Sequence, residues 1–104
     1  MFAKRVRTWV KSLRRAHLNI DDIRQLIRCS GSVAANYIEA NDSLSRKDFI
    51  MRIRISRKES KESRLFLRLL ESDPPTAEPE RLALIQESTE LMNIFGAILR
   101  NSGA

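Results

Sequence analysis

The side chains best suited to chemistry are few and lie far apart in this 104-residue sequence. His17 is the single histidine, which excludes metal sites built on two histidines. Cys29 is the single cysteine and is predicted to lie on another helix, so a buried structural thiol is favoured over a nucleophile. Glu59 and Glu62, one helical turn apart, could form a carboxylate pair for acid–base or metal chemistry.

The alternative for Glu59 and Glu62 is that they bond to Arg or Asn side chains across a helix interface. This interpretation is favoured because the sequence has no Glu-x-x-His partner for a metal site. We therefore predict a protein that is not an enzyme and that has no catalytic residues, metal or cofactor.

Four amphipathic helices are predicted, at about residues 2–17, 21–41, 45–72 and 79–100. The first has an apolar stripe at helical spacing, made of Phe2, Val6, Trp9, Leu13 and Ala16. Asn19 or Asp21 can cap the second helix. Ser45 with Asp48 is close to a capping box and starts the third helix, which Asp73, Pro74 and Pro75 end. The predicted fold class is all-α: an antiparallel up-down four-helix bundle, as a single domain over residues 1–104.

The third helix has apolar residues on two faces. One seam runs at steps of four and three through Phe49, Ile53, Ser56, Ser60, Ser63, Leu67 and Leu70. The second runs through Met51, Ile55, Glu59, Glu62, Phe66 and Leu69. The fourth helix likewise has two seams. Because one small core needs one face from each helix, the surplus predicts a homo-oligomer.

Positive charge gathers in two segments of a chain whose formal net charge is +6. Residues 1–20 contain basic side chains and no acidic one, and residues 46–68 are also strongly basic, whereas residues 71–100 are acidic overall. Lysine and arginine along a helix can neutralise phosphates, so the basic faces of the first and third helices are the candidate RNA- or DNA-binding surface. The candidate residues are Lys4, Arg7, Lys11, Arg14, Lys47, Arg54, Arg57, Lys61, Arg64 and Arg68.

The basic arc of the third helix contains no interleaved aromatic residue, so base stacking and sequence-specific recognition are not indicated. Two alternatives to nucleic-acid binding stay open. The arc can be a solvated face, or it can meet an acidic protein partner, such as residues 71–90 of a neighbouring subunit.

The basic, acid-free N-terminus also has features of a transit peptide or a membrane-surface helix. The bundle is favoured because the apolar stripe of the first helix is in register with it. No apolar run is long enough to span a bilayer, and an unpaired cysteine fits a reducing compartment. We therefore expect a cytoplasmic protein without a membrane partner.

Four short motifs occur in order between residues 29 and 70. They are Ala35-Asn36-x-x-Glu39-Ala40, Ser45-x-x-Asp48-Phe49, Lys58-Glu59-x-x-Glu62 and Phe66-Leu67-x-Leu69-Leu70. This pattern resembles the bacterial four-helix-bundle family labelled 23S rRNA intervening-sequence protein. The motif positions that carry the resemblance are Asn36, Glu39, Phe49, Lys58, Glu59, Glu62, Phe66 and Leu67. Phe66 stands where many members have Trp, and Ala34 where many have Gly or Pro; a helix tolerates both changes.

The resemblance implies an antiparallel four-helix bundle whose subunits assemble into a ring, commonly a pentamer. The chain is also similar to the accessory proteins of diversity-generating retroelements, which are basic rings that bind nucleic acid and a reverse transcriptase. The expected function is thus electrostatic binding of RNA or DNA by a homo-oligomer. The alternative is a structural or protein-interaction ring, for example a reverse-transcriptase accessory subunit, that does not bind nucleic acid itself.

Overall fold

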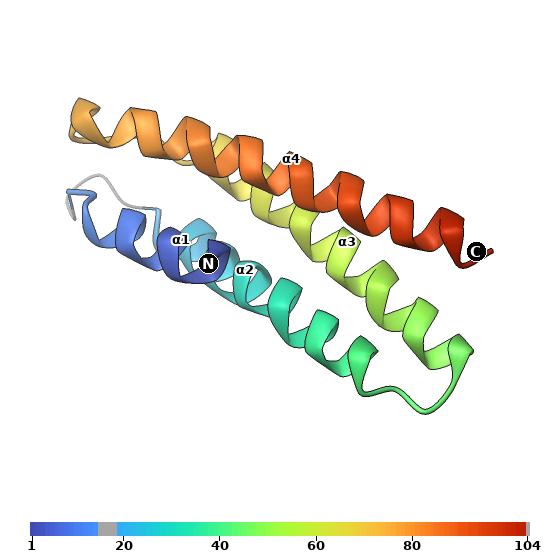
Figure 1. Ribbon diagram of the computed structural model, residues 1–104. Coiled ribbons are helices and arrows are strands. Elements are labelled where there is room, and N and C mark those ends of the chain that lie inside the picture. Colours follow the sequence, from blue (N-terminus) through green and yellow to red (C-terminus); the bar gives the residue numbers. More distant parts are fainter. Residues whose placement is uncertain (15–18, 104) are drawn as a thin grey trace.

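The computed structural model describes residues 1–14 and 19–103, and this part of the chain is entirely helical apart from its connections. Its elements are α1 (Phe2–Lys11), α2 (Ile20–Asn41), α3 (Arg46–Leu69), the short 3₁₀ helix η2 (Pro75–Ala77) and α4 (Glu78–Asn101). Successive long helices run in opposite directions (Figure 1). The prediction of an all-α up-down bundle is confirmed.

The long helices α2, α3 and α4 run the length of an elongated molecule of 47 × 19 × 19 Å. The shorter α1 packs against α2 and α4, and α3 packs against the same two helices, so α1 and α3 occupy opposite corners of the bundle. In Figure 1, α1 lies beside the N-terminal half of α2, and the other half of the molecule is formed by α2, α3 and α4. The outer faces of α1 and α3 therefore point in different directions.

The end of the first helix differs from the prediction. Helix α1 ends at Lys11, well before the predicted end near residue 17, because the chain turns here toward the α3–α4 connection. The backbone N–H of Arg14 donates a hydrogen bond of 2.7 Å to the carbonyl oxygen of Asp73. The Ser12 hydroxyl caps the helix end by donating to the carbonyl of Trp9 at 2.5 Å. Residues 15–18, and with them His17, lie outside the described part of the chain.

The starts of the next two helices follow their predicted caps. The side chain of Asn19 accepts a hydrogen bond from the backbone N–H of Asp22 at 3.2 Å. The hydroxyl of Ser45 accepts from the N–H of Asp48 at 3.1 Å and thereby starts α3. These contacts confirm the predicted N-caps of α2 and α3.

The core consists of two apolar clusters. One lies where α1 covers the bundle and includes Val6, Trp9, Leu26, Leu67 and Leu84. The other lies in the three-helix half and consists of Val33, Ala40, Ile53, Phe95 and Leu99.

Buried serines complete the contacts between the helices. They are Ser30, Ser56, Ser60, Ser63 and Ser88. The hydroxyl of Ser56 donates to the carbonyl of Val33 on α2 at 3.1 Å, and the other four donate to carbonyls one turn earlier in their own helix. Because serine is small, α2 and α3 can approach each other closely. The first predicted seam of α3 is thus confirmed as the side that faces the core.

The second predicted seam of α3 is buried only in part. Glu59 is buried and Phe66 is half-buried, whereas Met51 and Leu69 are exposed. The single chain therefore does not cover this seam completely. Among residues 1–14 and 19–103, none of the helices contains an apolar stretch of the length that spans a bilayer.

Candidate nucleic-acid interface

The predicted basic side chains of α3 form a line of unneutralised positive charge. Five of them are exposed, and within residues 1–14 and 19–103 their side chains have no ion pair or hydrogen bond; these are Lys47, Arg54, Arg57, Lys61 and Arg68. Arg64 is half-buried and donates a hydrogen bond of 3.3 Å to the hydroxyl of Thr89 on α4. From Arg54 to Arg68 the line extends about 21 Å, at 1.5 Å per residue. We call these six side chains the basic arc.

The predicted basic side chains of α1 have different surroundings. Arg7 donates hydrogen bonds to the carbonyls of Ala3 and Ile27, at 3.0 and 3.3 Å. Arg14 lies 3.3 Å from the carboxylate of Asp73. Lys4 and Lys11 are exposed.

The sequence predicted that the basic faces of the first and third helices form one joined surface. The structure shows that this is wrong, because α1 packs between α2 and α4 at the corner opposite α3. The α1 residues and the basic arc are therefore two separate surfaces, and the arc is the longer one.

The edge of α4 that borders the basic arc was not predicted as part of the site. Two contacts fix the register of the helices: Arg64 bonds to Thr89, and the backbone of Gly96 lies beside Arg57 and Arg100. A Cβ atom at Gly96 would be 3.8 Å from Nε of Arg57 and 3.4 Å from a guanidinium nitrogen of Arg100. At the same helical spacing this edge presents Gln86, Thr89, Asn93, Gly96 and Arg100, none of them acidic. The signal in the sequence was a pair of amide side chains, Gln86 and Asn93, two helical turns apart within an otherwise acidic segment.

Glu59 and Glu62 form a cross-helix ion pair with Arg28 of α2. The guanidinium of Arg28 donates to Glu59 at 3.1 Å and to Glu62 at 2.9 Å. Although partial burial opposes its charge, the hydrogen bond to Glu62 and the charge of Glu59 raise the pKa of Arg28 above its ordinary value. Lys58 lies 3.7 Å from the other oxygen of Glu59. The prediction that these carboxylates bond to Arg or Asn side chains across a helix interface is confirmed, and the partner is Arg28.

Removal of Glu59 is expected to destabilise the fold more than removal of Glu62. The Glu59 side chain is 4% exposed and that of Glu62 is 34% exposed. Glu59→Ala should lower the free energy of unfolding by about 1–3 kcal/mol, because a buried charge-assisted contact is lost. Glu62→Ala should cost at most about 1 kcal/mol. Urea denaturation followed by circular dichroism measures both, and Glu59→Gln, which keeps the shape and one acceptor, is the matched control. Equal losses for the two alanine variants would contradict the structural role of Glu59.

The other motif positions also hold helices together. The side-chain amide of Asn36 donates to the carbonyl of Ser32 at 3.0 Å and accepts from Arg52 of α3 at 3.2 Å. Leu67 is fully buried and Phe66 packs at the edge of the same cluster. Glu39 is exposed on α2. Most of the motif therefore describes how α2 and α3 pack together.

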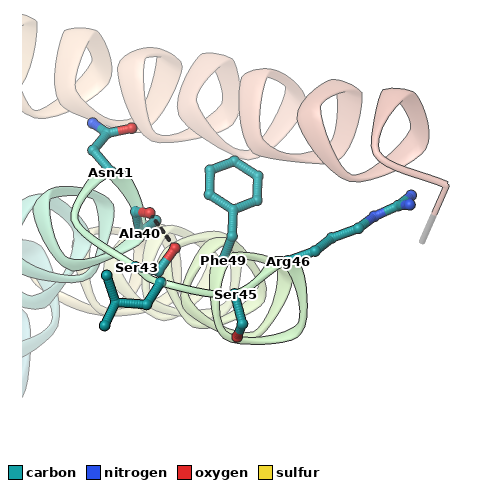
Figure 2. Close-up of a pocket in the computed structure, with 7 residues that line it drawn as sticks. Ala40, Asn41, Ser43, Ser45, Arg46 and Phe49 are labelled. Atoms are coloured by element: carbon teal, nitrogen blue, oxygen red, sulfur yellow. Dashed lines mark hydrogen bonds between the residues drawn. The ribbon is translucent and has the colours of Figure 1, made fainter.

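Phe49 marks a surface depression at the α2–α3 turn. Figure 2 shows its ring rising from α3 toward α4, with Arg46 extending toward the end of α4. Arg46 bonds there to the carbonyl of Ser102. The Ser43 hydroxyl donates to the carbonyl of Ala40 at 2.7 Å, and the Ser45 hydroxyl caps α3. Both hydroxyls thus serve the turn and do not form a nucleophile–base pair.

Cys29 is completely buried between α2 and α3. Its thiol donates to the carbonyl of Leu26 at 3.6 Å and accepts from the hydroxyl of Ser63 at 3.2 Å. Burial raises the pKa of this thiol, although the hydrogen bond from Ser63 opposes the shift. These surroundings fit a structural cysteine. In the described ranges, no three His, Cys, Asp or Glu side chains lie close enough together to hold a metal ion.

Together these features define a class of small, basic, antiparallel helical bundle, in which polar groups join the helices and the longer of two basic surfaces follows α3. The sequence matches the family described as 23S rRNA-intervening sequence protein over residues 1–97, and the chain belongs to this family.

Similarity to a solved structure supports this assignment. The chain is similar to a crystal structure of a protein with unknown function from the S23 ribosomal protein family, from Bacteroides thetaiotaomicron VPI-5482. The two share 27% sequence identity with a TM-score of 0.79, over 94% of this chain and 91% of that one. No curated protein matches the sequence.

Proposed function

We propose that this protein is a non-catalytic, homo-oligomeric protein that binds RNA or DNA electrostatically through the basic arc. The observation that carries the proposal is the line of exposed arginines and lysines on α3 without acidic partners in the described residues. Such side chains keep their full charge for an external anion. Binding to phosphates releases the counterions condensed on the nucleic acid, which supplies the driving force.

Salt dependence tests this proposal directly. Filter binding of the protein to unrelated RNA and DNA sequences should give similar affinities for all of them. Log K should fall by about 0.7–0.9 per phosphate contact for each log unit of salt. If single- and double-stranded probes both remain unbound by micromolar protein at about 100 mM salt, the arc is only a solvated face.

Exposed apolar side chains support the homo-oligomer. They include Met51, Leu65 and Leu69 on α3 and Leu82 and Ile94 on α4, each about half exposed. Association would remove this surface from water. Light scattering at micromolar concentration should give a stable oligomer, with the pentamer expected from the family resemblance. A monodisperse species with the mass of one chain would contradict this prediction. In a ring the arcs of several subunits act together, which turns modest affinity into avidity.

Contacts within the chain weigh against the alternative in which the arc binds the acidic segment of a neighbour. Arg5 of α1 already pairs with Glu80 and Glu87 of α4, at 2.8 Å each. Asp73 likewise pairs with Arg14. Three acidic residues of this segment therefore already have an arginine partner inside the subunit, which makes the segment a weaker partner for the arc of a neighbour.

A further inference from the structure

Two rows of side chains run next to each other along one face of the bundle. One is the basic arc on α3, and the other is the edge of α4 that borders it. We propose that this face takes a single-stranded nucleic acid, with phosphates along α3 and base edges turned toward Gln86 and Asn93 on α4. The inference rests on the proposed function and adds to it the strandedness and orientation of the ligand.

The register between α3 and α4 sets the two rows side by side. Because the helices are antiparallel, the contacts Arg64–Thr89 and Arg57–Gly96 place Lys61 between them, within one residue of the level of Asn93. Gln86 lies two turns from Asn93 along α4, in the direction of Arg68. Both amide side chains are exposed, and we call Gln86 and Asn93 the amide row. The axes of packed helices are about 8–10 Å apart, so a single extended strand can contact side chains of both α3 and α4.

The charges on α4 favour one orientation of the strand. Glu90 is exposed immediately beyond the amide row and accepts a hydrogen bond of 3.3 Å from Gln86. Its carboxylate repels phosphates from the outer side of α4, while the cations of α3 attract them. The backbone of a bound strand should therefore follow α3, which leaves the bases over α4.

The chemistry of the amide row suits base edges without selecting a sequence. An asparagine or glutamine side chain both donates and accepts hydrogen bonds, so it can pair with the polar edge of any base. In a duplex these edges are engaged in pairing or recessed in a groove, whereas an unpaired strand presents them. The amide row contains no aromatic side chain on which a base could stack, so hydrogen bonds to base edges are the base contacts that this row offers.

The decisive variant is Gln86→Ala combined with Asn93→Ala, measured by fluorescence anisotropy with three probes. The probes are a short mixed-sequence strand, the same strand made fully abasic, and the corresponding duplex. The wild-type protein should bind the intact strand about tenfold more tightly than the abasic strand, since two net hydrogen bonds are gained. The double variant should lose this tenfold preference and keep its affinity for the abasic strand and the duplex. Asn41→Ala, which removes an exposed amide at the end of α2, should change none of the three affinities.

Failure of this inference differs from failure of the proposed function. Equal wild-type affinity for intact and abasic strands, or an equal loss for all probes in the double variant, would overturn the role of the amide row while leaving electrostatic binding in place. Absence of binding to every probe would overturn both. Because both substituted residues are exposed, the melting temperature of the double variant should match that of the wild type, and this checks its fold.

Discussion

Reversal of charge at Arg57 and Lys61 is expected to weaken nucleic-acid binding about 40-fold at about 0.1 M salt. Each phosphate contact contributes about 0.8 log units to log K for each log unit of salt below 1 M, so two lost contacts account for about 1.6 log units. The variant Arg57→Glu/Lys61→Glu should also reduce the slope of log K against log salt by about 1.6. The loss should be the same for unrelated sequences. Both residues are exposed and have no partner in the described residues, so the helices should remain folded.

The matched control for this variant is Lys4→Glu/Lys11→Glu on α1, which changes the net charge by the same amount. These lysines are also exposed but belong to the opposite corner of the bundle. Their reversal should weaken binding several-fold less than reversal on α3. Equal losses in the two variants would show that net charge, and not the basic arc, controls binding. No loss in either variant would contradict the proposed interface.

The helices and their inner faces could be predicted because local sequence determines them. The caps at Asn19 and Ser45 act on backbone groups only three residues away, and the serine seam of α3 follows from a 4-3 spacing. The partner of Glu59 and Glu62 could be narrowed to an arginine or asparagine across a helix interface. The particular residue, Arg28, depended on how α2 and α3 pack.

The end of α1 and the composition of the candidate interface could not be predicted in this way. The chain leaves the helix after Lys11, and Arg14 then bonds to Asp73, which is distant in sequence. Periodicity identifies the polar face of a helix but not which helices are neighbours or how they are aligned. The separation of α1 from α3 and the placement of Asn93 beside Lys61 depend on both. Residues of the site on α4 therefore emerged only with the three-dimensional arrangement.

The largest loss of stability is expected from Trp9→Ala, at about 3–5 kcal/mol. Trp9 is 2% exposed within the cluster that α1 completes, and its indole N–H donates to the carbonyl of Ala77 at 2.9 Å. Helix α1 has 10 residues, too few for a stable isolated helix, so its structure depends on packing. Loss of the indole should therefore release α1 and open the core it covers.

Urea denaturation followed by circular dichroism measures this effect. Trp9→Phe keeps most of the apolar contact but leaves the Ala77 carbonyl without its partner, so it should cost about 1–3 kcal/mol. Tyr37→Ala removes an aromatic side chain that is 42% exposed and should cost less than Trp9→Ala. If Trp9→Ala unfolded within about 1 kcal/mol of the wild type, α1 would not belong to the cooperative core. A large loss, with nucleic-acid binding retained under native conditions, would separate the role of α1 in folding from the role of α3 in binding.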